Sequence, residues 1–417
     1  MRAIRGNIIE AKSLGKLDIL PNGCIITNDD GTTVETLPAL PLGFAGEIDD
    51  YKDALVMQSF CDMHSHAPQY PNLGMGYDLQ LLDWLAAYTF PIELRFADTE
   101  YARKVYKRLA RELVDNGTTR VSMFSSLHVD STLILMEELE NAGITGFVGK
   151  VNMDTNPNCR LVETTEESKR ETLRWLDSCG DFKNIRPMLT PRFTPSCSME
   201  LLEWLGKLAR ERGLYVQSHL SENRVEQALV LSLQPGITHY YQSYDRFGLF
   251  GDHTLMAHCV YCDDEELEAI RRNNVYAVHC ADSNISIVSG LSPVRKMLDM
   301  GIHVVLGSDI AGGTSLSMIR AARNAIYTSK VINVQSEYTT PFLTVAEAYY
   351  LATGAGAEYF GSKSGFAKGE KLHAIIVDDT ALFGTDKLSV RDRFGRCFYM
   401  CDDRQIKAVY GNGKRLK

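Results

Sequence analysis

Residues 54–66 read Ala-Leu-Val-Met-Gln-Ser-Phe-Cys-Asp-Met-His-Ser-His, an apolar run followed by two histidines that are separated by one residue. The apolar run predicts a buried strand, and side chains two residues apart on a strand point to the same side. His64 and His66 are therefore expected to project together. Paired imidazoles suit a divalent metal of borderline softness, and further ligands should then come from other strands.

The length and composition of the chain are those of a soluble globular enzyme. Its 417 residues allow two or three domains, or one large α/β barrel with an appendage. The sequence is 45% hydrophobic and 23% charged, and it contains no apolar run long enough to span a bilayer. We therefore expect no membrane partner.

The charge of the chain limits its partners and its location. The formal net charge is -9, from 53 acidic and 44 basic side chains that are spread without a block of one sign. This balance disfavours nucleic acid as a partner and favours a small neutral or cationic substrate. The first residues, Met1-Arg-Ala-Ile-Arg-Gly6, lack the apolar stretch of a secretory signal, so we expect a cytoplasmic protein.

The ten cysteines are interpreted as reduced residues of the core, because free cysteine is among the most buried residue types. Cys259-x-x-Cys262 and Cys397-x-x-x-Cys401 could together be imagined as a four-thiolate zinc site. We do not expect one, since Cys259 falls in a predicted buried strand and the two pairs lie in different regions of the chain.

Short apolar runs rich in β-forming residues alternate with helical patterns between residue 54 and about residue 360. The helices have recognisable starts, such as the capping box Thr164-x-x-Glu167. Eight such alternations predict an α/β fold, a parallel (β/α)8 TIM-like barrel. An open doubly wound sheet is the rival, but no G-x-G-x-x-G follows the first strand. The expected strands are Ala54–Cys61, Thr118–Phe124, Thr145–Met153, Arg186–Phe193, Tyr215–His219, Thr254–Val260, Val275–Cys280 and His303–Ser308.

Both ends of the chain differ from this pattern. They carry short alternating segments divided by turn residues such as Pro21-Asn22-Gly23 and Asn412-Gly413. We therefore expect a small β-sandwich domain formed from both termini. The predicted division is residues 1–57 and 365–417 for the sandwich and residues 58–364 for the catalytic barrel.

Ionisable residues stand at the carboxyl ends of five predicted strands, where the chemistry of a (β/α)8 barrel is concentrated. A single histidine in an apolar strand is more often a hydrogen-bonded core residue than a ligand. Seven imidazole or acidic groups at matching strand ends are harder to explain in that way. They are His64, His66, His219, Glu222, His258, His279 and Asp309.

Four of these groups suit one metal ion. The imidazoles of His64, His66 and His219 and the carboxylate of Asp309 would hold a single divalent metal and leave a position for water. Zn²⁺ is the expected metal, although the same ligand set also accepts Fe²⁺. A second metal is not expected, because the fourth strand ends in Thr190-Pro-Arg-Phe193 and offers no bridging lysine.

Glu222 follows His219 by three residues, an offset that would face the wrong way on a continuing strand. On a loop beyond the strand end, its carboxyl group could turn back over the mouth of the barrel. There it would be suited to moving protons to and from metal-activated water. The alternative is an ordinary solvated loop glutamate, and the proximity of His219 favours the catalytic interpretation.

The pattern resembles the amidohydrolase superfamily in its mononuclear deaminase branch, through His-x-His, His-x-x-Glu, a later His, His279-Cys-x-x-Ser-Asn284 and Ser308-Asp309. More narrowly it is similar to the guanine deaminases. Two departures from the family pattern, Gln58-Ser59-Phe60 and Ala281, supply no ligand. The stretches that carry the narrower resemblance are His66-Ala-Pro-Gln-Tyr70, residues 82–93 (LDWLAAYTFPIE), Thr164-Thr-Glu-Glu-Ser168, Thr190-Pro-Arg-Phe193, residues 217–223 (QSHLSEN) and residues 308–313 (SDIAGG).

The resemblance implies hydrolytic deamination of guanine to xanthine and ammonia, as part of purine metabolism. Water activated at the metal would attack C2 of guanine, and Glu222 would protonate N3. His258 would orient the water and Asp309 would accept its proton. A homodimer is also implied by the resemblance.

The resemblance further implies how the base is held. Gln69 and Arg192 would bind the edge of the purine, and Phe193 would pack against the ring. An arginine at a strand end is also often a structural ion-pair partner. Trp84 could line the pocket, but an amphipathic helix packing its own face explains it slightly better.

Two other functions fit the same residues. The chain could be another mononuclear amidohydrolase, acting on cytosine, an S-adenosylhomocysteine-like nucleoside or an aminotriazine. It could also be a non-catalytic scaffold that kept the barrel for assembly. The presence of all four ligands and of Glu222 disfavours the scaffold.

Overall fold

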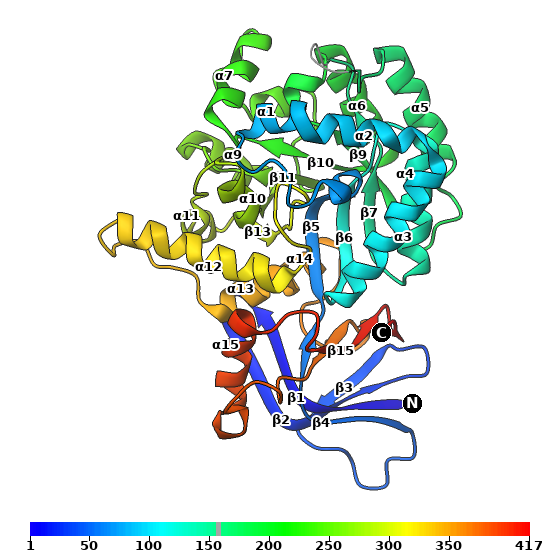
Figure 1. Ribbon diagram of the computed structural model, residues 1–417, viewed down its shortest axis with the longest axis vertical. Helices are drawn as coiled ribbons and strands as arrows, with labels where there is room; N and C mark the ends of the chain where they lie inside the picture. The colour runs from blue at the N-terminus through cyan, green and yellow to red at the C-terminus, as the bar shows by residue number, and fades with distance from the viewer. Residues whose placement is uncertain (156–159) are drawn as a thin grey trace.

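The computed structural model describes residues 1–155 and 160–417. It consists of a barrel surrounded by helices and, beneath it, a sheet that contains both termini (Figure 1). Among the residues described, no helix combines the length and the apolar character needed to cross a bilayer.

Eight parallel strands form the barrel, and each pairs with its neighbour in chain order. The ring is closed between its first strand and the segment after its last, where the Asp309 N–H donates to the His64 carbonyl (2.8 Å) and the His66 N–H donates to the Ile310 carbonyl (3.0 Å). This confirms the predicted TIM-like fold. The strands are β5 (Phe60–His66), β6 (Thr118–Phe124), β7 (Thr145–Gly149), β9 (Ile185–Pro191), β10 (Tyr215–Leu220), β11 (Thr254–His258), β12 (Tyr276–His279) and β13 (His303–Leu306), and the short β8 (Val151–Asn152) pairs with β9.

Helices surround the barrel, as Figure 1 shows. The expected capping box at the start of α5 is present, with the Thr164 and Glu167 side chains each bonded to the backbone of the other. The helices after β5 and its loop are α3 (Thr99–Asp115), α4 (Val129–Asn141), α5 (Thr165–Asp177), α6 (Met199–Arg212), α7 (Arg224–Leu233), α8 (Gln242–Asp245), α9 (Asp264–Arg272), α10 (Ala281–Ser286), α11 (Val294–Asp299), α12 (Met318–Gln335), α13 (Val345–Ala352) and α14 (Gly354–Tyr359). A short turn, η4 (Thr194–Ser196), follows β9.

The first predicted strand, residues 54–61, is wrong in its limits. Residues 54–58 end β4 (Glu47–Gln58), which belongs to the terminal sheet, and the barrel strand β5 starts only at Phe60. Ser59 separates the two strands, and its N–H donates to the His373 carbonyl. Both strands are continuously buried here, and hydrophobic periodicity cannot divide such a run.

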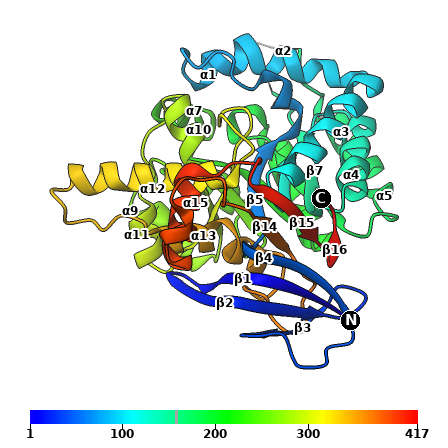
Figure 2. The same cartoon turned by 60° about the horizontal axis from the view of Figure 1, so that its bottom comes forward.

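Strands from both ends of the chain form one mixed sheet, in which β1 and β4 are parallel and the other neighbours antiparallel. Figure 2 shows this sheet beside the barrel. We propose to retain the division at residues 57/58 and 364/365. The sheet order is β16 (Lys414–Arg415), β15 (Ile406–Gly411), β14 (Ala374–Val377), β4, β1 (Arg2–Ser13), β2 (Lys16–Thr27) and β3 (Thr33–Leu37), and a helix that the sequence analysis did not expect, α15 (Val390–Met400), lies between β14 and β15, after the short turn η5 (Thr385–Lys387).

A run of short helices between β5 and α3 passes over the carboxyl ends of the barrel strands (Figure 1). We call residues 81–97 the cap segment. Its side chains are buried on one side, which faces the barrel mouth. It follows the turn η1 (Ala67–Asn72) and consists of α1 (Leu81–Trp84), the π-helical turn η2 (Leu85–Thr89), α2 (Phe90–Glu93) and η3 (Leu94–Ala97).

Candidate metal centre

The two histidines of β5 meet a third from β10. His64 and His66 are two residues apart on a strand and therefore share a face, here the interior of the barrel mouth. His66 Nε2 lies 3.1 Å from His219 Nε2. The three imidazoles offer nitrogen atoms within 4.8 Å of one another. The sequence analysis predicted this grouping.

The tautomer of His219 is fixed by the backbone. Its Nδ1 lies 2.6 Å from the carbonyl oxygen of Arg192, which can only accept a hydrogen bond. Nδ1 must therefore carry the proton, and the lone pair is left on Nε2, the atom that faces His66. Metal-binding histidines are commonly oriented by such a bond from the distal ring nitrogen.

Asp309 completes the group from a loop. β13 ends at Leu306, two residues earlier than predicted, and Asp309 adopts a left-handed conformation with φ 49°. Its Oδ1 lies 3.3 Å from His64 Nε2 and 3.6 Å from His66 Nε2. The loop is held by Asp62, whose carboxylate accepts the Ser308 N–H (2.8 Å) and hydroxyl (2.5 Å).

The protonation states of these groups fit a cation. Burial lowers the pKa of His64 and lowers those of His66 and His219 well below the ordinary value, so that the imidazoles are neutral near pH 7. Burial opposes the ionisation of Asp309, but the neighbouring His64 and His258 lower its pKa to about 2. The His64 Nε2 atom is buried and has no hydrogen-bond partner among the residues described. Neutral imidazoles and an ionised carboxylate are what metal binding requires.

His258 differs from the other three imidazoles. It ends β11 in a left-handed conformation, φ 74°, and its Nδ1 lies 2.9 Å from Asn284 Oδ1. Its Nε2 lies 3.4 Å from a Glu222 oxygen and 3.8 Å from an Asp309 oxygen. Burial would lower the pKa of His258, but these two carboxylates outweigh burial and raise it. His258 is thus placed to carry a proton between two acids.

Glu222 turns back over the barrel mouth, as the sequence analysis expected. Ser221, immediately before it, has φ 49°, and this left-handed residue redirects the chain at the end of β10. Glu222 is only 3% exposed and accepts a hydrogen bond from the Ser289 hydroxyl at 2.8 Å. Burial raises its pKa, which suits a group that must hold and release a proton near neutral pH.

A second buried glutamate, which the sequence analysis did not single out, lies behind Glu222. Glu226 is the third residue of α7, and its carboxylate accepts the backbone N–H groups of Glu222 (3.1 Å) and Asn223 (3.3 Å). Its other oxygen accepts the Tyr240 hydroxyl at 2.8 Å. Burial and then the nearby Glu222 raise the pKa of Glu226 from 4.5 to about 7.

This shifted pKa predicts a pH-dependent contribution to stability. Between about pH 5 and about pH 7 the folded protein holds a proton on Glu226 that the unfolded chain has released, so folding takes up a proton. Stability from this group is complete below pH 4.5 and is lost as the pH rises through about 7. In urea unfolding, the free energy of unfolding of the wild-type protein relative to that of Glu226→Gln should therefore fall as the pH rises from about 5 to about 8. If the free energies of unfolding of the two proteins change equally with pH, the pKa of Glu226 is not raised.

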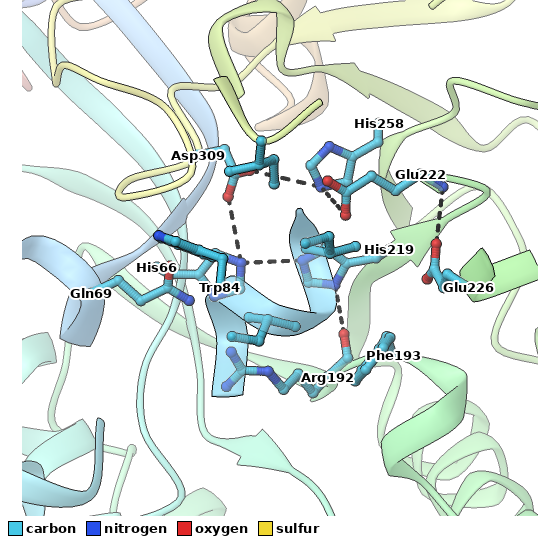
Figure 3. A pocket seen from close by; sticks show the side chains of 13 residues that line it. His66, Gln69, Trp84, Arg192, Phe193, His219, Glu222, Glu226, His258 and Asp309 are labelled. Carbon is cyan, nitrogen blue, oxygen red and sulfur yellow. Dashed lines mark hydrogen bonds and ion pairs between the residues drawn. The ribbon is translucent and has the colours of Figure 1, made fainter. Parts of the chain in front are cut away.

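The ligand group opens into a narrow buried cavity of about 30 Å³. Figure 3 shows the polar side chains of Gln69, Arg192, Glu222 and Asp309 around it. Its wall consists of His66, Gln69, Leu81, Trp84, Leu85, Arg192, Phe193, His219, Glu222, Glu226, His258, Ile287 and Asp309.

The three predicted base-binding residues all lie on this cavity. Gln69 comes from η1, and Arg192 and Phe193 follow β9. Arg192 is 3% exposed, and its guanidinium is paired with the buried carboxylate of Glu93. Arg192 therefore lines the cavity and also forms the structural ion pair that the sequence analysis gave as its alternative role.

Of two further residues considered in the sequence analysis, Trp84 lines the cavity and His279 does not. The packing interpretation of Trp84 was incomplete, because its ring is buried and also lines the cavity, while its Nε1 donates to the Met75 carbonyl at 2.9 Å. His279 is buried at the end of β12 but is not part of the cavity wall. From the motif that starts at His279, it is Asn284 that reaches the site, through its bond to His258.

Comparison with known proteins agrees with this geometry. Residues 55–416 match the model of the Amidohydrolase family. A guanine deaminase of Dictyostelium discoideum is 35% identical, over 100% of this chain and 98% of that protein, and one of Mus musculus is 39% identical, over 86% and 82%. A crystal structure of guanine deaminase from C. acetobutylicum with bound guanine in the active site superposes with a TM-score of 0.97, at 41% identity over all of both chains.

The match to the family model covers most of the chain, and the curated relatives are similar over nearly its full length. These matches indicate that the chain is a hydrolase that acts on C–N bonds. The chain therefore belongs to the amidohydrolase family and, within it, to the guanine deaminases.

Proposed function

We propose that this protein hydrolyses guanine to xanthine and ammonia. The observation that carries the proposal is that one cavity joins the metal-ligand group to Glu222 on one side and to Gln69 and Arg192 on the other. A planar base with carbonyl and ring-nitrogen atoms calls for a few directed polar groups in a mostly apolar pocket, and this cavity offers both. The guanine-bound relative described above supports the same substrate.

We assign His64, His66, His219 and Asp309 as ligands of one divalent metal, with Zn²⁺ preferred for three imidazoles and a carboxylate. When bound, the metal would lower the pKa of a coordinated water to about 7 and so supply hydroxide at neutral pH. Fe²⁺ is accepted by the same donor set, so the choice of metal rests on elemental analysis.

Glu222 is assigned as the proton carrier of the reaction. Its carboxyl group is buried, faces His258 and has a raised pKa, so it can take a proton from the attacking water and give it to N3 of guanine. The Ser289 hydroxyl holds Oε1 of this carboxylate, and Oε2 is directed toward His258. Ammonia then leaves C2, and xanthine remains.

His258 and Asp309 act together on the attacking water. His258 Nε2 lies between the two carboxylates, and its Nδ1 is oriented by the side chain of Asn284. In this position the imidazole would orient the water for attack on C2, and Asp309 would accept the second proton of the water, which passes to the amino group at C2 so that it leaves as ammonia.

Gln69 and Arg192 hold the polar edge of the base, and Phe193 packs against the ring. Guanidinium N–H groups can pair with the carbonyl oxygen and N7 that guanine presents on one edge. A purine base is thus the proposed partner. We further propose that the protein acts in the cytoplasm, in purine metabolism, as a homodimer.

One sample tests the proposal. Protein purified without added metal should contain about one zinc or iron atom per chain, and the same sample should release ammonia and xanthine from guanine at a rate of about 1 per second or faster. Turnover of cytosine, an S-adenosylhomocysteine-like nucleoside or an aminotriazine in place of guanine would overturn the substrate. Protein without metal and without rescue by zinc would instead indicate a scaffold.

A further inference from the structure

We propose that Glu93 is a positioning residue that sets the preference of the cavity for a purine with a carbonyl group at C6. Glu93 does not line the cavity. It lies behind Gln69 and Arg192, holds both, and so decides which of their atoms face the base. The inference rests on the proposed function, because it concerns how guanine is recognised.

The Glu93 carboxylate is bonded to Arg192 at both of its oxygens. Arg192 Nη1 lies 2.5 Å from Oε2, and Nη2 lies 3.0 Å from Oε1. Glu93 is 1% exposed, so neither charge has water as an alternative partner. A fork of this kind fixes the plane of the guanidinium as well as its position.

The same carboxylate fixes the amide of Gln69. Gln69 Nε2 donates to Glu93 Oε1 at 3.0 Å, and Gln69 Oε1 accepts the backbone N–H of Ala311 at 3.2 Å. Rotation of the amide by half a turn would oppose Nε2 to an N–H group and Oε1 to a carboxylate. The orientation is therefore determined, with one N–H and one lone pair of the amide left for a ligand.

The cap segment supplies both contacts to the guanidinium. Phe90 and Glu93 are three residues apart on α2, a spacing that puts their side chains on one face of a helix. The Arg192 guanidinium carbon lies 4.9 Å from the centre of the Phe90 ring while its end faces Glu93. The cap segment thus holds Arg192, the residue that follows β9, in one orientation across the barrel mouth.

The consequence for the base follows from counting donors. A guanidinium carries five N–H groups, and Glu93 takes two, which leaves three that can only donate. Guanine presents a carbonyl acceptor at C6, whereas 2-aminopurine carries only hydrogen there. The locked guanidinium should therefore favour guanine, and a guanidinium that is free to turn should favour it less.

The competing explanation is that Glu93 only ties the cap segment to the barrel. A matched ion pair far from the cavity separates the two roles. Asp379 and Arg393 in the terminal sheet region are joined by two hydrogen bonds, of 2.6 and 3.1 Å, and their side chains are 1% and 4% exposed. Asp379→Asn removes the buried carboxylate of this pair, while Arg393 keeps its bonds to the Asp53 side chain (2.9 Å) and carbonyl (2.8 Å), so the variant reports the cost of weakening a purely structural pair.

The test compares the wild-type protein, Glu93→Gln and Asp379→Asn, with guanine as substrate and 2-aminopurine as competing base. For Glu93→Gln we expect KM for guanine to rise about 10-fold and kcat to change less than about threefold. We also expect the preference for guanine over 2-aminopurine to fall at least about threefold, with metal content unchanged. Asp379→Asn should lower Tm and leave KM, kcat and the preference as in the wild type.

Each other outcome has a defined meaning. If Glu93→Gln lowers Tm as Asp379→Asn does but leaves KM and the preference unchanged, the pair is structural and the inference is wrong. If Glu93→Gln does not fold, Glu93→Asp, which keeps the charge and withdraws it by one methylene, should show a smaller loss of preference in the same direction. An unchanged preference in Glu93→Asp would then overturn the inference. A wild-type protein that does not turn over guanine would overturn the proposed function itself.

Discussion

Glu222→Gln is expected to retain its metal and to lose nearly all turnover, by about 1,000-fold in kcat. The amide has the shape of the carboxyl group but cannot carry a proton from water to the base. Glu222 is buried, lies 3.4 Å from His258 and has a raised pKa, so its carboxyl group is suited to a proton transfer that the amide cannot perform. Steady-state ammonia release and elemental analysis of one preparation measure the two quantities together.

A control variant distinguishes the loss of proton transfer from the loss of a buried negative charge. Glu163→Gln also replaces a mostly buried carboxylate, which pairs with the buried Lys150 at 2.8 Å outside the cavity wall. This variant should keep kcat within about threefold of the wild-type value. If Glu222→Gln deaminates guanine at near the wild-type rate, Glu222 is not the proton carrier and the assignment has to pass to another group.

The arrangement of the barrel could be predicted because its signals are local. A parallel strand buried on both faces appears in the sequence as a short apolar run, and turns and helix caps limit it. β6 was predicted with its observed limits, Thr118–Phe124. The boundary between β4 and β5 could not be predicted, because residues 54–61 are buried throughout and only pairing with β1 and β14 assigns the first half to the terminal sheet.

The ligand group could be predicted for a similar reason. In a barrel the carboxyl ends of strands distant in sequence meet on one face, so His64, His219 and Asp309 needed only a strand assignment to be grouped. The supporting residues lack such a signal. Glu93 lies in a helix after η1 and Glu226 lies inside α7, where a glutamate is an ordinary surface residue until the fold buries it.

His66→Ala is expected to lose the metal. His66 Nε2 faces His219 Nε2 at 3.1 Å and Asp309 Oδ1 at 3.6 Å, so removal of its ring takes away one of four ligands. With two imidazoles and one carboxylate, affinity should fall at least about 100-fold, and protein purified without added metal should contain less than about 0.1 metal atom per chain. Turnover should fall in proportion to metal content, because the remaining side chains cannot activate water at neutral pH.

A histidine at the other end of a barrel strand provides the control. His303 starts β13, is exposed, and stacks on Tyr276 at 4.5 Å between ring centres. His303→Ala should therefore keep both metal and turnover, which excludes a general effect of removing an imidazole. Metal content of His66→Ala equal to that of His303→Ala would remove His66 from the ligand set. His64, His219, His258 and Asp309 would then have to hold the metal, an arrangement in which His258 could no longer orient the water.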